Sequence, residues 1–229
     1  YGLLIYNGKI PGKIKKEAVK YLQESADLEN PVSMLYYGNM LLKGDLVEKN
    51  TEKGIDYIKN SADSGNSDAA LKYGLILYDG FEIPQNKKAA AIYLKKSADS
   101  GNEEAILKYA QMLINGDGIQ VNKEEGLIYM KMLADQGNKT AMFEYGILMT
   151  ENDELEINLK YLEYIKDSAS LGNTKALVEL GKRLLKKCDN IKILEKAADL
   201  GDPEGMFTYG NSLYFGIGIP ADKKEALEY

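Results

Sequence analysis

The sequence has no histidine and no tryptophan, and Cys188 is the single cysteine among its 229 residues. Without histidine the chain lacks the usual general base, the commonest metal ligand and the H-E-x-x-H zinc signature. One cysteine makes neither an internal disulfide nor a thiol–imidazole pair, so we interpret Cys188 as a residue near a helix end and not as a nucleophile. These absences predict a chain that is not an enzyme and that needs no metal or cofactor.

Long apolar runs and an excess of positive charge are also missing. No stretch of eighteen apolar residues is present, which argues against direct insertion of this segment into a membrane. The 35 acidic residues outnumber the 29 basic ones, for a net charge of -6, and this balance opposes binding to nucleic acid. The lone cysteine favours a reducing, cytoplasmic location, with the lumen of the endoplasmic reticulum and secretion left open.

Other motifs that could carry chemistry are incomplete. The loops GDGIQV at Gly116 and GIGIPA at Gly216 lack the third glycine and the Gly-Lys-Ser/Thr ending of phosphate-binding loops. The acidic pairs at 103–104 and 124–125 follow predicted helix caps, where carboxylates favour the positive end of the helix dipole. We therefore interpret them as solvated helix starts.

An internal repeat organises what is present. The hexapeptide SADSGN occupies residues 61–66 and again 97–102, and glycines in the same register are separated by 36, 36, 35 and 29 residues. Each is followed by asparagine or, in the last case, aspartate. These glycines are Gly65, Gly101, Gly137, Gly172 and Gly201.

A second column of small residues, nearly always preceded by tyrosine, has the same register. Its members are Gly2, Gly38, Gly74, Ala110, Gly146, Gly181 and Gly210. Further columns of alanine, asparagine and tyrosine agree with both, and five columns in one register exclude coincidence. A fixed period of this length is typical of repeat architectures.

Each repeat reads as two helices. Apolar residues at helical spacing break at YDGFEIPQN, and a second apolar stripe follows. Asn86 is placed to cap the start of the second helix, Gly101 to end it in a left-handed conformation, and Asn102 to cap the next helix. A glycine inside a helix costs about 1 kcal/mol relative to alanine, so we expect Gly74 to permit close contact between helices.

These columns resemble Sel-one-like repeats, relatives of tetratricopeptide repeats with a longer loop inside each helix pair. The resemblance rests on AALKYGLILYDGFEIPQNKKAAAIYLKKSADSGN at 69–102, echoed by AILKYAQMLINGDGIQVNKEEGLIYMKMLADQGN at 105–138, and covers essentially the whole chain. It implies an all-α fold, a right-handed α-solenoid of stacked helix-turn-helix repeats, forming one domain over 1–229. The expected repeats are 1–30 (partial), 31–66, 67–102, 103–138, 139–173, 174–202 (short) and 203–229 (partial). Because the chain begins and ends inside a repeat, we expect it to be part of a longer array.

Three departures from the pattern bear on local packing. The first corner has Glu29-Asn30 in place of Gly-Asn, and Asn152 replaces a loop glycine. Both are expected to be tolerated, because asparagine enters the left-handed region more readily than most residues. The unit 174–202 lacks the Gly-x-Gly loop, so we expect a helix pair with a shortened turn.

A variable stripe on the first helices is the candidate binding surface. The columns of Leu71, Tyr73 and Leu77 stay apolar and are expected to pack, whereas those of Lys72, Leu75 and Asp79 vary at positions i, i+3 and i+7 on one face. The alternative interpretation is an ordinary solvated surface. The predicted partner-binding residues are Tyr36, Asn39, Lys43, Lys72, Leu75, Asp79, Lys108, Gln111, Asn115, Glu144, Ile147, Glu151 and Phe215.

Within this stripe Tyr36, Leu75, Ile147 and Phe215 are the expected apolar anchors, because binding energy concentrates in a few large side chains. The resemblance implies a non-catalytic scaffold or adaptor that holds a protein or peptide along a concave groove, within a multiprotein complex in some cases. A structural subunit of a large assembly is the first alternative. A penicillin-binding or enzyme-regulating role is the second, although the chain lacks both the cysteines of those relatives and any Ser-x-x-Lys.

Overall fold

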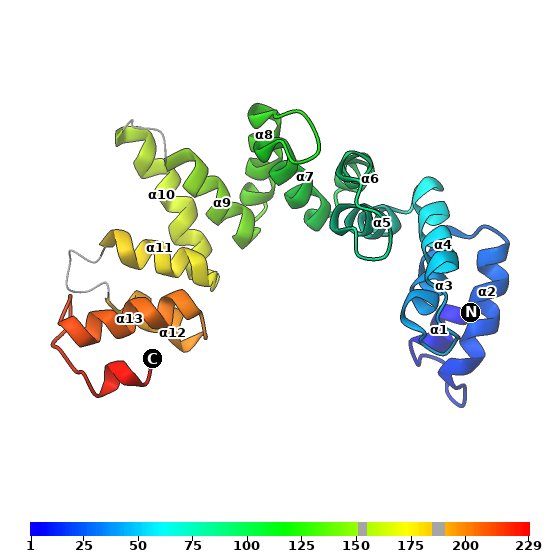
Figure 1. The fold of residues 1–229 in the computed structure, drawn as a ribbon, viewed down its shortest axis with the longest axis horizontal. Coiled ribbons are helices and arrows are strands. Elements are labelled where there is room, and N and C mark those ends of the chain that lie inside the picture. Colours follow the sequence, from blue (N-terminus) through cyan, green and yellow to red (C-terminus); the bar gives the residue numbers. More distant parts are fainter. Residues whose placement is uncertain (151–154, 185–190) are drawn as a thin grey trace. The chain divides into compact units, whose positions relative to one another are not determined.

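The computed structural model describes residues 1–150, 155–184 and 191–229, and the regular structure within these ranges is helical throughout, with no strand (Figure 1). This confirms the predicted all-α class. The elements are α1 (Gly2–Tyr6), α2 (Lys15–Asp27), α3 (Pro31–Lys43), α4 (Thr51–Asp63), α5 (Ser67–Asp79), α6 (Lys87–Asp99), α7 (Glu103–Asn115), α8 (Lys123–Asp135), α9 (Lys139–Thr150), α10 (Leu155–Ser170), α11 (Thr174–Leu184), α12 (Ile191–Asp199), α13 (Pro203–Phe215) and the short 3-10 helix η2 (Glu225–Leu227).

The helices pack as stacked pairs inside two compact units, residues 1–126 and 127–229. In the first unit α1 packs on α2, α3 on α4 and α5 on α6, and each pair contacts the next through α2 with α3, α4 with α5 and α6 with α7. In the second unit α9 packs on α10 and α11 on α12, while α10 contacts α11 and α12 contacts α13. The predicted helix pair in 174–202 is therefore present as α11 and α12. Its connection, including Cys188, lies outside the described residues, as does Asn152.

The corner between repeats has the backbone geometry predicted for Gly65 and its equivalents. At Gly65 φ is 88°, its N–H donates to the carbonyl of Ala62 at 3.1 Å, and the N–H of Asn66 donates to that of Ser61 at 3.1 Å. This pair of bonds is the Schellman motif, which satisfies carbonyls left over at a helix end. The other four glycines also have positive φ, at Gly101, Gly137, Gly172 and Gly201.

The first corner has the same geometry without glycine. Glu29 itself adopts φ 61°, its N–H donates to Ala26 at 2.9 Å, and the N–H of Asn30 donates to Ser25 at 3.1 Å. The expected tolerance was correct, but its reason was misplaced: the left-handed residue is the glutamate, and Asn30 is the cap that follows. The left-handed conformation costs a non-glycine residue about 1 kcal/mol, which the two corner hydrogen bonds offset.

Asparagine side chains start the helices on both sides of each pair, as predicted for Asn86 and Asn102. The Oδ1 of Asn86 accepts from the N–H of Ala89 at 3.0 Å, and that of Asn102 accepts from Ala105 at 3.1 Å. Asn158, in the same sequence column as Asn86, differs, because α10 begins three residues before it. The other asparagine caps with this bond are Asn30, Asn50, Asn66, Asn122, Asn138 and Asn173.

The first serine and the aspartate of SADSGN connect helices within a pair and between neighbouring pairs. The buried Oγ of Ser61 donates to the backbone carbonyl of Pro31 at 2.6 Å, joining the two helices of one pair. The carboxylate of Asp63 accepts from the hydroxyl of Tyr93 at 2.9 Å, on the second helix of the next pair. The same contacts recur between Ser97 and Ser67, Ser168 and Lys139, Asp27 and Tyr57, and Asp135 and Tyr164. The hexapeptide thus contains a corner, a cap and two links.

Small residues in the first helices allow close packing within a pair, as expected for Gly74. A Cβ added at Gly74 would lie 2.9 Å from the Cγ of Leu94. At Gly38 an added Cβ would lie 2.8 Å from the carbonyl oxygen of Gly54, which faces it on α4. Such distances are shorter than carbon–carbon and carbon–oxygen contacts allow, so these glycines set how closely the helices approach.

Candidate functional site

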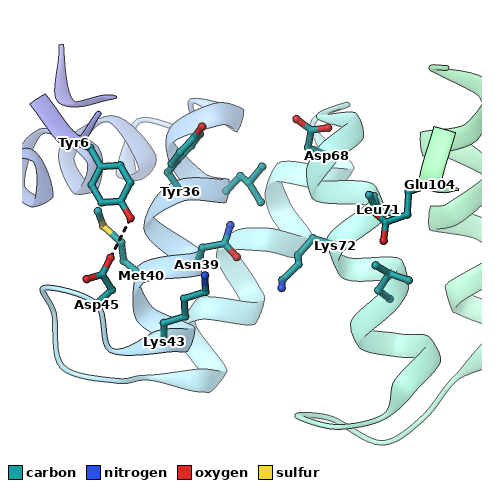
Figure 2. A pocket seen from close by; sticks show the side chains of 12 residues that line it. Tyr6, Tyr36, Asn39, Met40, Lys43, Asp45, Asp68, Leu71, Lys72 and Glu104 are labelled. Atoms are coloured by element: carbon teal, nitrogen blue, oxygen red, sulfur yellow. Dashed lines mark hydrogen bonds between the residues drawn. The ribbon is translucent and has the colours of Figure 1, made fainter. Parts of the chain in front are cut away.

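A groove in the first unit is lined by residues from the first helices of successive repeats (Figure 2). Its volume is about 510 Å³, and its walls come from α1, α3, α5 and α7. Each repeat contributes its first helix because the corner glycines and asparagine caps restart the chain in the same way every 36 residues. The lining residues are Tyr6, Leu35, Tyr36, Asn39, Met40, Lys43, Asp45, Asp68, Leu71, Lys72, Leu75 and Glu104.

A second cavity continues from the first. Its volume is about 380 Å³, and it shares Asn39, Lys43, Lys72 and Leu75 with the groove. Beyond them it reaches the end of α5 and the loop that follows. The lining residues there are Ile76, Asp79, Phe81 and Glu82, and Leu42 on α3 completes the cavity. The two cavities thus form one surface depression across α3 and α5, open on both sides of the shared residues.

Hydrogen bonding divides the polar side chains of the groove into two kinds. The hydroxyl of Tyr6 donates to Asp45 at 3.0 Å, and this bond, together with burial, raises the pKa of Tyr6. In contrast Asn39, Lys43 and Lys72 form no hydrogen bond or ion pair within the ranges that the structure describes. Water or a ligand must satisfy these three side chains.

The aromatic and apolar side chains make the floor of the groove. The rings of Tyr6 and Tyr36 meet edge to face with centroids 6.3 Å apart. Leu71 and Leu75 on α5 are half-buried, and Phe81 in the adjoining cavity is 87% exposed. The surface therefore offers apolar area next to unpaired polar groups, a combination typical of protein interaction sites.

The described residues contain neither a metal-binding cluster nor a membrane-spanning helix. Over residues 1–150, 155–184 and 191–229, no group of three or more histidine, cysteine, aspartate or glutamate side chains is placed to hold a metal ion. The helices in the same ranges lack the length and apolarity that crossing a membrane requires.

Comparison with known families assigns the repeats. The family model of the Sel1 repeat matches residues 1–30, 31–66, 67–102, 103–138, 191–202 and 203–229. The chain belongs to the Sel1 repeat family. The expected resemblance is thereby confirmed over most of the sequence. A search of curated proteins found no match.

Solved structures show the same fold. A Sel1 repeat protein from Oxalobacter formigenes is 22% identical, with a TM-score of 0.85 over 99% of this chain and 92% of that protein. A protective antigen of uropathogenic Escherichia coli strains, which displays an SLR fold, is 21% identical with a TM-score of 0.69. That match covers 98% of this chain, which spans only 58% of the length of the antigen. At these identities the likeness establishes the fold alone.

Five of the predicted partner-binding residues line the groove of the Sel1 repeats in the first unit, namely Tyr36, Asn39, Lys43, Lys72 and Leu75, and Asp79 lines the adjoining cavity. Their exposure follows the repeat: the i and i+3 positions are half-buried and the i+7 positions are exposed. Tyr36 also packs against the core cluster of α1 to α3, so this predicted anchor has a structural role as well.

The remaining predicted residues of the first unit lie on α7 and line neither cavity. The ammonium group of Lys108 sits 3.6 Å from the ring centroid of Tyr78, a cation–π contact with the preceding repeat. Gln111 is half-buried and Asn115 is exposed.

In the second unit the predicted residues are not gathered into one site. Glu144 and Ile147 are half-buried on α9, and Ile147 packs against the core of that unit. Phe215 ends α13, is 67% exposed and meets the ring of Tyr214 at 4.8 Å. Glu151 lies outside the described residues.

Sequence reasoning missed the ends and loops that complete the groove. Asp68 and Glu104 are each the second residue of a first helix, and Tyr6 and Asp45 come from the end of α1 and a loop. A signal was available for the last pair, because a tyrosine and an aspartate 39 residues apart recur at Tyr78 and Asp117. There Lys87 joins the contact at 2.7 Å, and hydrogen bonds from Lys87 and then Tyr78 lower the pKa of Asp117.

Proposed function

We propose that this Sel1 repeat chain is a non-catalytic scaffold that binds a protein partner through an extended segment lying in the groove on α3 and α5. The fold is typical of protein-binding scaffolds, in which stacked repeats present a continuous surface built from their first helices. The observation that carries the proposal is the combination of half-buried and exposed apolar side chains with the amide of Asn39 and the ammonium groups of Lys43 and Lys72, which are unpaired among the described residues.

The side chains that would contact the bound segment are not used up by contacts within the fold. Leu75 is half-buried and belongs to both cavities, so a segment that crosses the groove must cover it. The main-chain N–H and C=O groups of an extended segment can bind the Asn39 side chain, which is both donor and acceptor. Recognition of this kind combines apolar anchors with a few polar contacts.

Replacing Leu75 with glutamate tests the proposed groove. We expect random dodecapeptides displayed on phage to yield binders of the intact chain, and Leu75→Glu to weaken their affinity about tenfold or more, since a charge would replace apolar area at the centre of the site. Fluorescence anisotropy with labelled peptides measures the dissociation constants.

Leu28→Glu is the matched control. Leu28 is 83% exposed, follows α2 and lies outside both cavities, so the same chemical change there should leave the affinity unchanged. Circular dichroism checks that both variants are helical. Equal binding by Leu75→Glu and the parent chain, or a selection that yields no binder, would contradict the proposed function.

A further inference from the structure

Lys43 and Lys72 both line the groove, and neither has an ion-pair partner among the residues that the structure describes. Lys43 at the end of α3 and Lys72 in the middle of α5 direct their amino groups toward the space between the two helices (Figure 2). The side-chain amide of Asn39 lies beside the amino group of Lys43 (Figure 2). Both lysines line both cavities, so this point is where the two meet.

Several lysines on the second helices, in contrast, have an acidic partner on the same helix. On the second helices Lys59 pairs with Asp63 at 3.2 Å and Lys95 pairs with Asp99 at 3.1 Å, each one helical turn away. Such pairs compensate charge locally. Lys43 and Lys72 have no such partner in the described part of the chain.

No acidic residue of the groove or of the adjoining cavity forms an ion pair with Lys43 or Lys72 in the described ranges. In the adjoining cavity Glu82 pairs with Lys49 instead, and Asp79 at the end of α5 pairs with neither lysine. Asp45 accepts from the hydroxyl of Tyr6, and Asp68 accepts from the side-chain amide of Asn102 at 3.4 Å. In Figure 2 the Asp68 carboxylate points away from Lys72, and Glu104 lies on α7 beyond Leu71. Two neighbouring ammonium groups beside an unpaired amide favour an anion between them, because a carboxylate can accept hydrogen bonds from all three.

We propose that the segment bound in this groove carries an aspartate or glutamate side chain that binds between Lys43 and Lys72, with apolar residues on either side of it. This inference rests on the proposed function and specifies its ligand. The acidic group belongs to the interior of the segment and not to its carboxyl terminus, because the groove continues past the lysines in both directions. On one side the walls are Tyr36 and Leu71, and on the other they are Ile76 and Phe81.

Charge reversal at the two lysines tests the inference. Peptides selected from the random library against the parent chain should be enriched in one central acidic residue flanked by apolar ones. The double variant Lys43→Glu/Lys72→Glu should lower their affinity about a hundredfold, at about tenfold for each charge-assisted contact, and should select a basic residue at that position when the library is screened again.

Three controls separate the possible outcomes. Lys16→Glu changes the same charge at an exposed site on α2 outside the groove, and it should leave binding unchanged. A peptide with glutamine in place of the acidic residue should bind the parent chain more weakly than the original peptide, and the double variant should bind this neutral peptide no more weakly than it binds the acidic one, because only the acidic peptide is repelled by the new carboxylates. Amidating the carboxyl terminus should have no effect, whereas a large loss on amidation would overturn the assignment to an interior side chain.

The acidic preference of the bound segment is tested separately from the use of the groove as a binding site. Selected peptides that are sensitive to Leu75→Glu, but that show no acidic preference or tolerate the charge reversal, would overturn this inference and leave the groove as the binding site. A library that yields no binder would overturn both.

Discussion

Replacing Gly38 with alanine should destabilise the first unit by about 2 kcal/mol, although alanine is the better helix former by about 1 kcal/mol. The added methyl would lie 2.8 Å from the carbonyl oxygen of Gly54 and 2.8 Å from Cγ1 of Ile58. Because the oxygen is part of the α4 backbone, the overlap is relieved only if the two helices move apart, which costs packing along the whole pair. Urea unfolding followed by circular dichroism measures the change.

Gly210→Ala is the control at the equivalent position of the last repeat. There the added methyl would lie 3.3 Å from Cβ of Tyr229 and 3.4 Å from the carbonyl oxygen of Ala226. Tyr229 follows the short helix η2 and can yield by a few tenths of an ångström, so the gain in helix propensity should dominate and stability should rise by up to about 1 kcal/mol. Effects of the same sign and size in both variants would show that the glycines do not set the helix spacing.

Raising the pH above 10 should destabilise the protein through its buried tyrosines. Burial and then the carboxylates of Glu195 and Glu225 raise the pKa of Tyr209 to about 12. Burial and the neighbouring Tyr161 raise that of Tyr145 to about 12. Since the folded pKa lies above the unfolded value of 10, the stabilisation is fully present below pH 10 and is lost as the pH rises toward 12.

For Tyr209, which is 2% exposed, a shift of this size corresponds to roughly 3 kcal/mol. Thermal unfolding between pH 9 and 12 should therefore show a steeply falling midpoint, and Tyr209→Phe should flatten the dependence. Absorbance near 295 nm follows phenolate formation directly. Ionisation of every tyrosine near pH 10 in the folded protein would contradict the prediction.

Much of the fold could be predicted because each repeat forms the same corner, helix cap and close helix crossing. The glycine at 65 and its equivalents, the asparagine after it and the small residue at 74 each have one physical cause, namely a left-handed corner, a helix cap and a close crossing. Because these residues recur in a fixed register, comparing the repeats of this one sequence with each other was enough to predict their structural roles.

Contacts between repeats were harder to predict than those within one. The bond between Tyr93 and Asp63 joins residues 30 apart, and nothing in either residue alone indicates the partner. Glu29 is a different case, because asparagine enters the left-handed region more readily, yet Glu29 occupies the position of the corner glycine and adopts its positive φ.

The candidate site was partly predicted. The variable stripe placed Lys43, Lys72 and Leu75 on one face, since helical periodicity fixes which side chains lie together. It did not reveal Asp45 or Phe81, which come from loops whose conformation the helical period does not describe. Whether the stripe on α9 and α13 takes part in binding stays a prediction.

The central claim, that the groove on the first helices binds the partner segment, is tested most directly by locating a bound peptide. A photoreactive phenylalanine analogue in place of Phe81, which is 87% exposed in the adjoining cavity, should crosslink to a selected peptide with little change in side-chain shape. The same analogue at Tyr21, which is 41% exposed on α2 outside both cavities, should not. Mass spectrometry showing the peptide attached at position 81 alone is the predicted result, and equal attachment at both positions, or attachment only at 21, would contradict the account.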